Sequence, residues 1–257
     1  MKKFVSFIVG ILVSTAGLTA QNADDIVTRS RNRISATSTS TQSRMVVLNR
    51  DKTTNELIIN QYSQDDSQGN ARTLVEFLRP NTVRGSRFLT VGNAGGAANK
   101  WIFLPKLGKV RRIATAEGEG SFMGTDFSYE DIASLDRAAD ADVHALLKEE
   151  NFGGRACYVI ESKPKDKTYQ YSRIVSWIGK NDSLNYKMEL YDKKDKLVKI
   201  FESSNFQDVQ GRVTARQSKM STLSTGGSTT IYIDKISYDD KIPEGVFTPN
   251  YLATGKY

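Results

Sequence analysis

The feature that most constrains the fold is a long succession of strand-like segments separated by turn signals. Residues typical of β-strands gather in segments such as 171–178 and 229–238, and turn-forming pairs such as Gly153-Gly154 and Gln210-Gly211 lie between neighbouring segments. Within 186–190, apolar and charged side chains alternate, as in a strand with one wet face. Because helical patterns that could join parallel strands are missing, the sequence predicts antiparallel hairpins in one large sheet.

A sheet with one apolar face needs a cover, and this chain offers little helix to supply it. We predict a short helix within 24–33 and a second covering segment at 125–135. So few helical residues would leave part of a broad curved sheet uncovered, which predicts a hollow lined by apolar groups. The predicted strands span residues 35–48, 56–62, 72–79, 86–91, 100–104, 143–149, 156–162, 171–178, 186–191, 197–203, 212–220 and 229–238.

The chain begins with the layout of a secretory signal peptide, which we place at residues 1–20. Two lysines precede an apolar run at 4–18, and small residues follow up to Ala20. The run is shorter than the roughly 20 residues that a helix needs to cross a bilayer. We therefore expect cleavage after Ala20, export to the periplasm and a single mature domain over 21–257. Because Gln21 stands where a lipoprotein signal requires cysteine, we expect that the protein is not itself lipidated.

The composition argues against most classes of enzyme. The chain has one cysteine, Cys157, and one histidine, His144, so it offers no intramolecular disulfide and no set of His or Cys ligands for zinc. We interpret Cys157 as a small buried hydrophobe. No nucleophile elbow, phosphate loop or calcium loop is recognisable, and the acids between Glu130 and Asp142 are explained by solvation of a loop and a helix end. We therefore expect no catalytic residue, no metal and no cofactor.

The charge balance is moderately basic. The chain has 36 Lys and Arg against 29 Asp and Glu, and loss of Lys2 and Lys3 with the signal peptide would leave 34 − 29 = +5. A basic exported protein can contact anionic lipid head groups or acidic partners, whereas nucleic acid is not an expected partner in the periplasm. An ordinary solvated hairpin is the alternative for the residues that could make such contacts, which are Lys106, Lys109, Arg111 and Arg112.

The densest apolar and aromatic stretch runs from 74 to 129. Several of its segments are apolar at consecutive positions, so both faces of those strands must be shielded from water. Gly124 beside Phe122 and Met123 suggests a movable lid, and a packed cover without motion is the alternative. The residues that we predict at the wall or lid of an apolar cavity are Phe77, Phe88, Leu89, Trp101, Phe103, Phe122, Met123 and Phe127.

In this stretch and in two later segments, the chain resembles the outer-membrane lipoprotein-sorting proteins, which are relatives of the periplasmic lipoprotein carrier LolA. The resemblance covers nearly the whole mature chain, and its longest and most specific piece is GSFMGTDFSYED at 120–131. The other pieces are RGSRFL at 84–89, WIFLPKLGKVRRI at 101–113, GRACYVI at 154–160 and FTPNYL at 247–252.

The resemblance implies a mainly β fold, a half-open antiparallel β-barrel in which a few short helices plug an apolar cavity. It implies a periplasmic carrier that binds the acyl chains of a lipid or lipoprotein and moves them between envelope membranes. Such a carrier would work with an inner-membrane transporter, an outer-membrane acceptor or both. The alternatives are a non-transporting sensor or adaptor that binds lipoproteins and a regulatory partner, and an envelope structural module or unrecognised hydrolase. The sequence names neither the cargo nor the oligomeric state.

Overall fold

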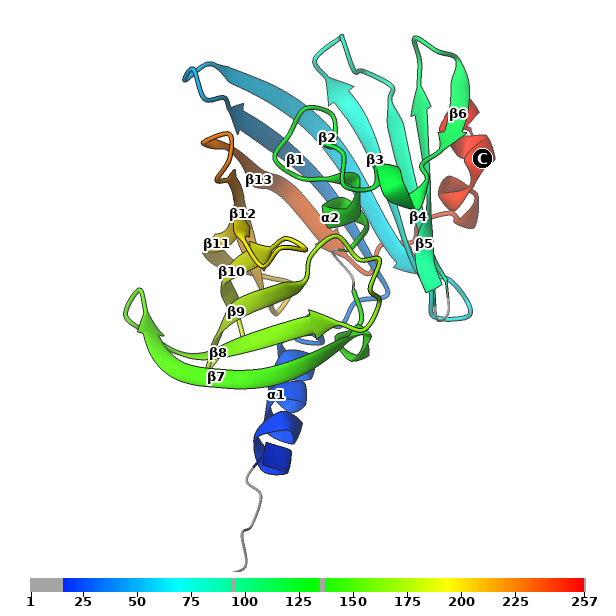
Figure 1. Ribbon diagram of the computed structural model, residues 1–257. Helices are drawn as coiled ribbons and strands as arrows, with labels where there is room; N and C mark the ends of the chain where they lie inside the picture. Colours follow the sequence, from blue (N-terminus) through cyan, green and yellow to red (C-terminus); the bar gives the residue numbers. More distant parts are fainter. Residues whose placement is uncertain (1–15, 94–95, 135–136, 257) are drawn as a thin grey trace, which may run out of the picture.

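A single 13-stranded antiparallel sheet dominates the computed structural model, which describes residues 16–93, 96–134 and 137–256. The sheet is strongly curved, and a few short helices lie against it (Figure 1). The strands are β1 Ser38–Leu48, β2 Thr54–Asp65, β3 Ala71–Arg79, β4 Arg87–Asn93, β5 Gly96–Leu104, β6 Lys109–Arg112, β7 Asp142–Phe152, β8 Arg155–Pro164, β9 Arg173–Gly179, β10 Asn185–Tyr191, β11 Leu197–Val209, β12 Arg212–Thr222 and β13 Gly227–Tyr238. The helices are α1 Ala16–Arg31, α2 Tyr129–Ala133 and α3 Pro249–Thr254, with 3-10 turns at Thr115–Glu117, Ala139–Ala141 and Glu244–Phe247.

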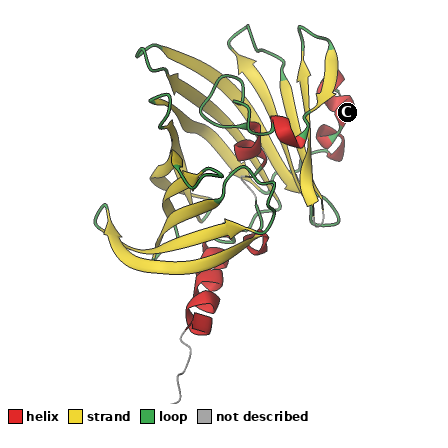
Figure 2. Ribbon diagram, in the orientation of Figure 1, coloured by secondary structure: helices red, strands yellow, loops and turns green. Residues whose placement is uncertain are grey.

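Two meanders make up the sheet. Its strand order is β6-β5-β4-β3-β2-β1-β13-β12-β11-β10-β9-β8-β7, so each strand from β1 to β6 and from β7 to β13 pairs with its neighbour in sequence. The two meanders join where β1 pairs with β13, for example at Thr39 and Tyr238. The edge strands β6 and β7 stand at opposite ends of this order, and the sheet stays open between them (Figure 2). The predicted half-open barrel is confirmed.

The connection between the two edge strands crosses the hollow of the sheet. After β6 the chain runs through residues 113–141 to β7 and carries α2 over the concave face, which we call the inner face (Figure 1). Ser128 caps α2 by accepting from the Asp131 amide at 2.9 Å, and the Asp131 carboxylate accepts from the Ser128 amide at 2.8 Å. Thr229 of β13 accepts from the Asp126 amide at 2.9 Å and donates to its carboxylate at 2.7 Å. This crossing segment is therefore tied to the middle of the sheet.

Two hairpins show how local sequence sets the register. Gln210 and Gly211 both have positive φ, 52° and 77°, and so do Gly153 and Gly154, at 56° and 80°. Two successive residues with positive φ form the tight turn whose twist matches antiparallel strands, which explains why glycine stands at three of these four positions. The long β11–β12 and β7–β8 ribbons follow from these turns.

The region of β2–β5 and the loop 113–134 above it forms a packed core, which we call the packed half. Phe122 inserts between Phe77, Phe88 and Tyr129, with ring centroids 5.3–5.4 Å apart. Phe77, Phe88 and Phe122 are completely buried. Offset and edge-on aromatic contacts of this kind add to the free energy gained from burial.

The C-terminal segment covers the outer face of the same strands. Leu74, Leu89 and Trp101 form a row across β3, β4 and β5 in the strand register. They pack with Phe247 and Leu252, which lie in the last 3-10 turn and in α3. This cover explains the consecutive apolar residues in β3–β5, because both faces of these strands are buried by the chain itself.

Most predicted strands occur within a few residues of their expected bounds, and β6 is an additional short strand within the basic segment. The helix expected at 24–33 begins earlier, at Ala16, and runs continuously through Ala20. Residues 1–15 of the expected signal peptide lie outside the described residues. None of the helices in the described ranges is long and apolar enough to span a bilayer.

Candidate functional site: two cavities under the curved sheet

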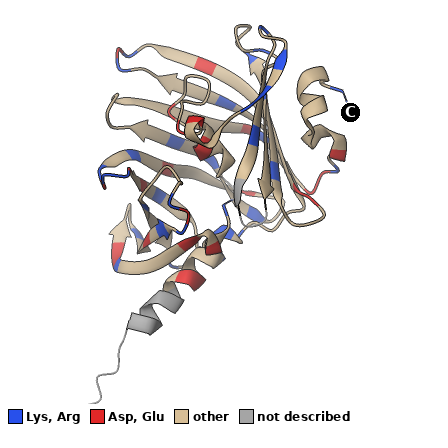
Figure 3. Ribbon diagram, turned by 45° about the vertical axis from the view of Figure 1, so that its right-hand side comes forward, with Lys and Arg blue, Asp and Glu red and all other residues tan. Residues whose placement is uncertain are grey.

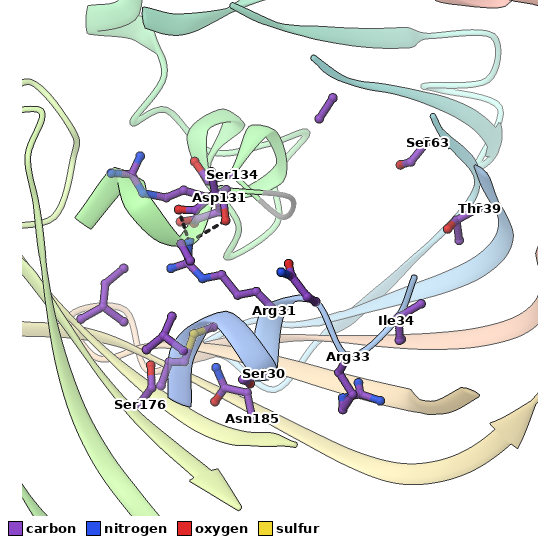
Figure 4. Close-up of a pocket in the computed structure, with 18 of the residues that line it drawn as sticks. Ser30, Arg31, Arg33, Ile34, Thr39, Ser63, Asp131, Ser134, Ser176 and Asn185 are labelled. Atoms are coloured by element: carbon purple, nitrogen blue, oxygen red, sulfur yellow. Dashed lines mark hydrogen bonds between the residues drawn. The ribbon is translucent and has the colours of Figure 1, made fainter. Parts of the chain in front are cut away.

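A cavity of about 720 Å³ lies on the inner face between the end of α1, the crossing segment, strands β9–β12 and the adjoining ends of β1, β2 and β3. We call it the helix cavity. Figure 4 shows Arg31 at the end of α1, with Asp131 and Ser134 of the crossing segment on one side and Ser176 and Asn185 on the other. The cavity thus exists where the crossing segment no longer fills the space above the sheet.

The floor of the helix cavity is apolar and comes from the inner face of four consecutive strands. In β9 the alternation places Ile174, Ser176 and Ile178 toward the cavity, while Val175 and Trp177 pack on the outer face. The other apolar floor residues are Met188 and Leu190 of β10, Phe201 of β11 and Met220 of β12. We call this region, β9–β12 with its cavity, the hollow half.

A group of polar contacts around Asp131 holds the crossing segment over this floor, and we call it the Asp131 latch. The Asp131 carboxylate, whose side chain is only 7% exposed, pairs with the Lys199 ammonium at 2.7 Å. It also accepts from the Tyr171 hydroxyl and the Gln170 amide, each at 2.8 Å. Burial, reinforced by the neighbouring carboxylate, raises the pKa of Tyr171 well above its usual value, so the phenol remains a donor.

One end of the helix cavity is rich in arginine. Arg31 and Arg137 both hydrogen-bond to the fully buried Asp142 carboxylate, at 3.2 and 2.7 Å. Arg31 also donates to the carbonyls of Arg137 and Ala138, which ties α1 to the crossing segment. Burial lowers the pKa of Arg31, but an arginine at such a site still carries its charge.

A second cavity, of about 710 Å³, lies on the other side of the crossing segment. We call it the loop cavity. Its walls include Thr73 and Thr90 on the inner face of β3 and β4. Nearby, Lys100 is 2% exposed and pairs with Glu130 at 2.5 Å. Ser134, Arg137 and Tyr169 line both cavities, so these residues form the partition between them.

The structure divides the predicted cavity residues between the two faces of the sheet. Phe77, Phe88, Phe122 and Met123 belong to the inner-face core of the packed half, and Phe127 also lines the helix cavity. Leu89, Trp101 and Phe103 instead lie in the outer-face cluster under the C-terminal segment and line neither cavity. The reason is the two-residue period of a strand: Leu89 and Trp101 alternate with the inward-facing Phe88 and Ile102.

The segment expected as a lid or a packed cover has the contacts of a cover. Phe122 is completely buried, and its amide donates to the Phe127 carbonyl at 2.7 Å. The Thr125 hydroxyl donates to the Phe122 carbonyl at 2.7 Å, and the Ser121 hydroxyl donates to the Thr125 carbonyl at the same distance. These bonds close a compact turn at Met123 and Gly124, both of which have positive φ.

The predicted basic contact residues lie in the exposed β5–β6 hairpin at one edge of the sheet (Figure 3). Arg111 pairs with Glu117 at 2.7 Å, and Arg112 hydrogen-bonds to Asn99. Lys106 and Lys109 are exposed and make no ion pair with any of the described residues. Leu107 lies between these lysines and is 63% exposed.

The lone histidine and the lone cysteine are both buried. His144 Nε2 lies 2.8 Å from the Ala139 carbonyl oxygen, and Nδ1 lies 2.7 Å from the Ser162 hydroxyl. A carbonyl can only accept, so Nε2 carries the proton and Nδ1 can accept from Ser162. Cys157 is a free thiol in the outer-face cluster with Trp177, as predicted for a small buried hydrophobe. Within the described ranges, no group of three or more potential metal ligands occurs.

The residues that build the helix cavity were mostly missed by the sequence interpretation. The floor residues Ile174, Met188 and Leu190 lie in strands that were predicted, and their alternation was the signal that could have identified them. The arginines at the end of α1 carried no such signal, because their distance from β9–β12 along the chain hides their position in space.

Comparisons with known proteins agree with this architecture. A family model with the description "-like: Uncharacterized protein" matches residues 69–254. A DUF1329 family protein from Desulfovibrio piger is 30% identical, with a TM-score of 0.87 over 91% of this chain and 99% of that chain. A candidate outer-membrane lipoprotein-sorting protein domain from Vibrio parahaemolyticus is 27% identical, with a TM-score of 0.85 and the same two coverages.

A more distant structure has the same fold. A LolA superfamily protein from Nitrosomonas europaea is 20% identical and has a TM-score of 0.70 over 92% of this chain and 98% of that chain. Among curated proteins, none matches the sequence. The sheet therefore has the LolA-like architecture that the sequence motifs implied.

Proposed function

Because the chain belongs to the DUF1329 family and has the LolA-like fold, we propose that it is a periplasmic carrier for acyl chains. It binds a lipid or the lipid part of a lipoprotein in the helix cavity and moves it between envelope membranes. A membrane transporter supplies the cargo or an outer-membrane acceptor receives it. The name of the Vibrio parahaemolyticus relative, a lipoprotein-sorting protein domain, supports this class of cargo.

The observation that carries the proposal is the apolar floor of the helix cavity. Its volume of about 720 Å³ lies within the range of pockets that enclose small molecules. Ile174, Met188 and Leu190 offer the cargo an aliphatic surface, and Phe201 and Met220 continue this surface across the next two strands. A straight hydrocarbon chain can lie across these strands and be removed from water.

The energetics favour a carrier that releases its cargo. Each methylene removed from water contributes about 0.8 kcal/mol, so a long chain in a dry pocket would bind too tightly to leave readily. The wall of the helix cavity also contains polar groups such as Ser176, Asn185 and Arg31, which lose hydration when the cargo enters. This cost offsets part of the gain and keeps binding reversible.

We assign the β5–β6 hairpin to contact with anionic head groups or with an acidic partner surface. Lys106 and Lys109 are exposed and lie on either side of the exposed Leu107. Basic side chains near an anionic membrane each contribute about 1 kcal/mol of attraction. Reversing both charges, as in Lys106→Glu/Lys109→Glu, is expected to weaken binding to anionic vesicles without changing the cavity.

The test is native mass spectrometry with solvent extraction on the protein purified from periplasm without detergent. We expect a stoichiometric lipid or acylated species in the wild type. Met188→Trp places a large ring in the helix cavity and is expected to remove that species. Leu223→Trp makes the same kind of change at a residue that is 47% exposed and outside the cavity, so it should retain the lipid.

A transfer experiment separates the carrier from a sensor or adaptor. Purified protein with bound lipid is mixed with acceptor vesicles, and lipid in the vesicles is measured over time. A carrier releases its lipid to the vesicles, whereas an adaptor retains it. Ligand-free protein that also takes up no added lipid would contradict the proposal.

A further inference from the structure

The helix cavity contains a buried arginine nitrogen that has no partner. Arg33 follows α1 by two residues and lines the cavity. One of its terminal nitrogens donates to the Val213 carbonyl, but its Nε is buried without a hydrogen-bond partner. Among the described residues no carboxylate forms an ion pair with Arg33. Burial lowers the pKa of Arg33, and the guanidinium still carries its charge. An unsatisfied charged donor is unfavourable unless a ligand satisfies it.

Three further buried polar atoms on the wall of this cavity have no hydrogen-bond partner: Arg72 Nε and Gln64 Oε1, whose side chains hydrogen-bond to Glu244 through other atoms, and Asn185 Oδ1. Asn185 is the first residue of β10, and its side-chain oxygen is buried without a partner. Figure 4 shows Asn185 and Arg33 in the lower part of the view, across from Asp131 and Ser134. An asparagine amide can turn by half a rotation and present its N–H₂ group, so it can donate to an acceptor that enters the cavity.

Among the described residues that line the cavity, Arg33 is the cation without a salt bridge, although the Asp182 carboxylate acts on it electrostatically. Asp131 pairs with Lys199, and Arg72 pairs with Glu244, which lies outside the cavity. Arg31 and Arg137 share the single Asp142 carboxylate, and Asp65 is exposed to solvent. The charged side chains on the wall are Arg31, Arg33, Asp65, Arg72, Asp131 and Arg137. The end of the cavity next to α1 is therefore electropositive.

The arginine-rich end adjoins the apolar floor within one cavity. The floor begins at Ile178 of β9 and Met188 of β10, on the strands that border Asn185. A ligand that contacts both parts would therefore have an apolar chain and a negatively charged end. Guanidinium groups bind phosphate and carboxylate oxygens strongly, because hydrogen bonds and charge act together.

We infer that the helix cavity binds an anionic amphiphile whose hydrocarbon chain lies on the β9–β12 floor and whose phosphate or carboxylate is held by Arg33 and Asn185. This inference rests on the proposed carrier function and specifies its cargo. It predicts that lipids ending in an anionic group bind more tightly than acyl chains attached to an uncharged group.

The experiment compares two ligands of equal chain length by isothermal titration calorimetry. The exported protein, stripped of co-purifying lipid, is titrated with dodecyl phosphate and with dodecyl alcohol. We expect the phosphate to bind at least about tenfold more tightly, since charge-assisted hydrogen bonds are the stronger class. Arg33→Gln should remove this preference and leave the affinity for the alcohol unchanged.

Matched variants control for the loss of one positive charge and for folding. Arg29→Gln removes a charge from an exposed position on α1, the helix that precedes Arg33, and should keep the preference. Arg33→Lys keeps the charge but lacks the planar fork, so it should retain only part of the preference. The thermal unfolding midpoint of each variant shows whether the fold is intact.

The outcomes distinguish this inference from the carrier function. Equal binding of both ligands by the wild type would overturn the anionic cargo and leave the carrier intact. Failure to bind either ligand would overturn both. Inorganic phosphate is the third titrant: if it binds as tightly as dodecyl phosphate, the site takes a free anion and the amphiphile is excluded.

Discussion

The packed half and the hollow half present similar apolar side chains on the same face of one sheet, yet the crossing segment stacks aromatic rings on them mainly in the packed half. In the packed half, Phe122 and Tyr129 of the crossing segment occupy the space above Phe77 and Phe88. In the hollow half, the segment passes above β9–β12 and leaves about 720 Å³. The cover, and not the strand, determines whether an inward-facing residue becomes core or cavity wall.

The two halves also differ in how the crossing segment is held. Over the packed half it is held mainly by aromatic packing, which fills volume. Over the hollow half the Asp131 latch to Lys199 and Tyr171 holds it, together with an edge-on contact between Phe127 and Phe201. These contacts hold the segment above the floor without filling the space beside it.

The largest effect that would test this comparison is the loss of a filling ring. Phe122→Ala should lower the free energy of unfolding by about 3–5 kcal/mol, since the ring is fully buried and its removal leaves a void. Met188→Ala in the hollow half should cost less than about 2 kcal/mol, because one side of Met188 already faces the cavity.

Urea unfolding measures both values. The slope of the unfolding free energy with urea should be the same in the two variants, which would show that the unfolded states are comparable. Equal losses in the two halves would mean that the helix cavity is filled in solution.

An intermediate effect is expected when side chains are enlarged. Val75→Phe in the packed half should destabilise by about 1–3 kcal/mol, because Val75 is completely buried against close neighbours. Ile174→Phe extends into the helix cavity and should cost less than about 1 kcal/mol.

Ile174→Phe should also displace lipid that co-purifies with the wild type, whereas Val75→Phe should retain it. Thermal unfolding together with native mass spectrometry measures both effects in one preparation. A large destabilisation by Ile174→Phe would contradict the conclusion that Ile174 faces the helix cavity.

The smallest effect concerns alkaline pH. Burial, followed by the hydrogen bond to Asp182, raises the pKa of Tyr186 in β10 to about 12. The pKa in the unfolded chain is about 10, so the folded value is the higher one. The stability linked to this phenol is therefore fully present below about pH 10 and is lost as the pH rises toward about 12.

Denaturation midpoints across this alkaline range provide the measurement. Tyr186→Phe has no ionisable phenol and should lose less stability than the wild type as the pH rises. Burial also raises the pKa of Tyr169 and Tyr171, so the variant should keep part of the dependence. If the two curves remain parallel, Tyr186 does not contribute.

The fold was more predictable from the sequence than the site. Alternating patterns and turn pairs such as Gln210-Gly211 act locally, so they identified nearly all strands. The side on which Trp101 and Phe103 pack could not be read from the same pattern, because β5 is apolar on both faces and the C-terminal cover is remote in sequence.

The polar end of the cavity was least predictable. Arg33 ends the range in which the first helix was expected, and Asn185 immediately precedes the strand that was expected at 186–191. Both residues line one cavity because the segment after α1 lies near β10 in space, which the local sequence pattern does not encode. Contacts between residues that are far apart in the chain produce no recognisable pattern within a short segment of sequence.

The pairing of β1 with β13 has a consequence for how the protein folds. Thr39 pairs with Tyr238, so the join between the two meanders brings together strands that are far apart in the sequence. Contacts of such long sequence separation form slowly, since most of the chain must be ordered before they become favourable. The helix cavity is lined by both Thr39 of β1 and Tyr238 of β13, so its wall is complete only after the two meanders have joined.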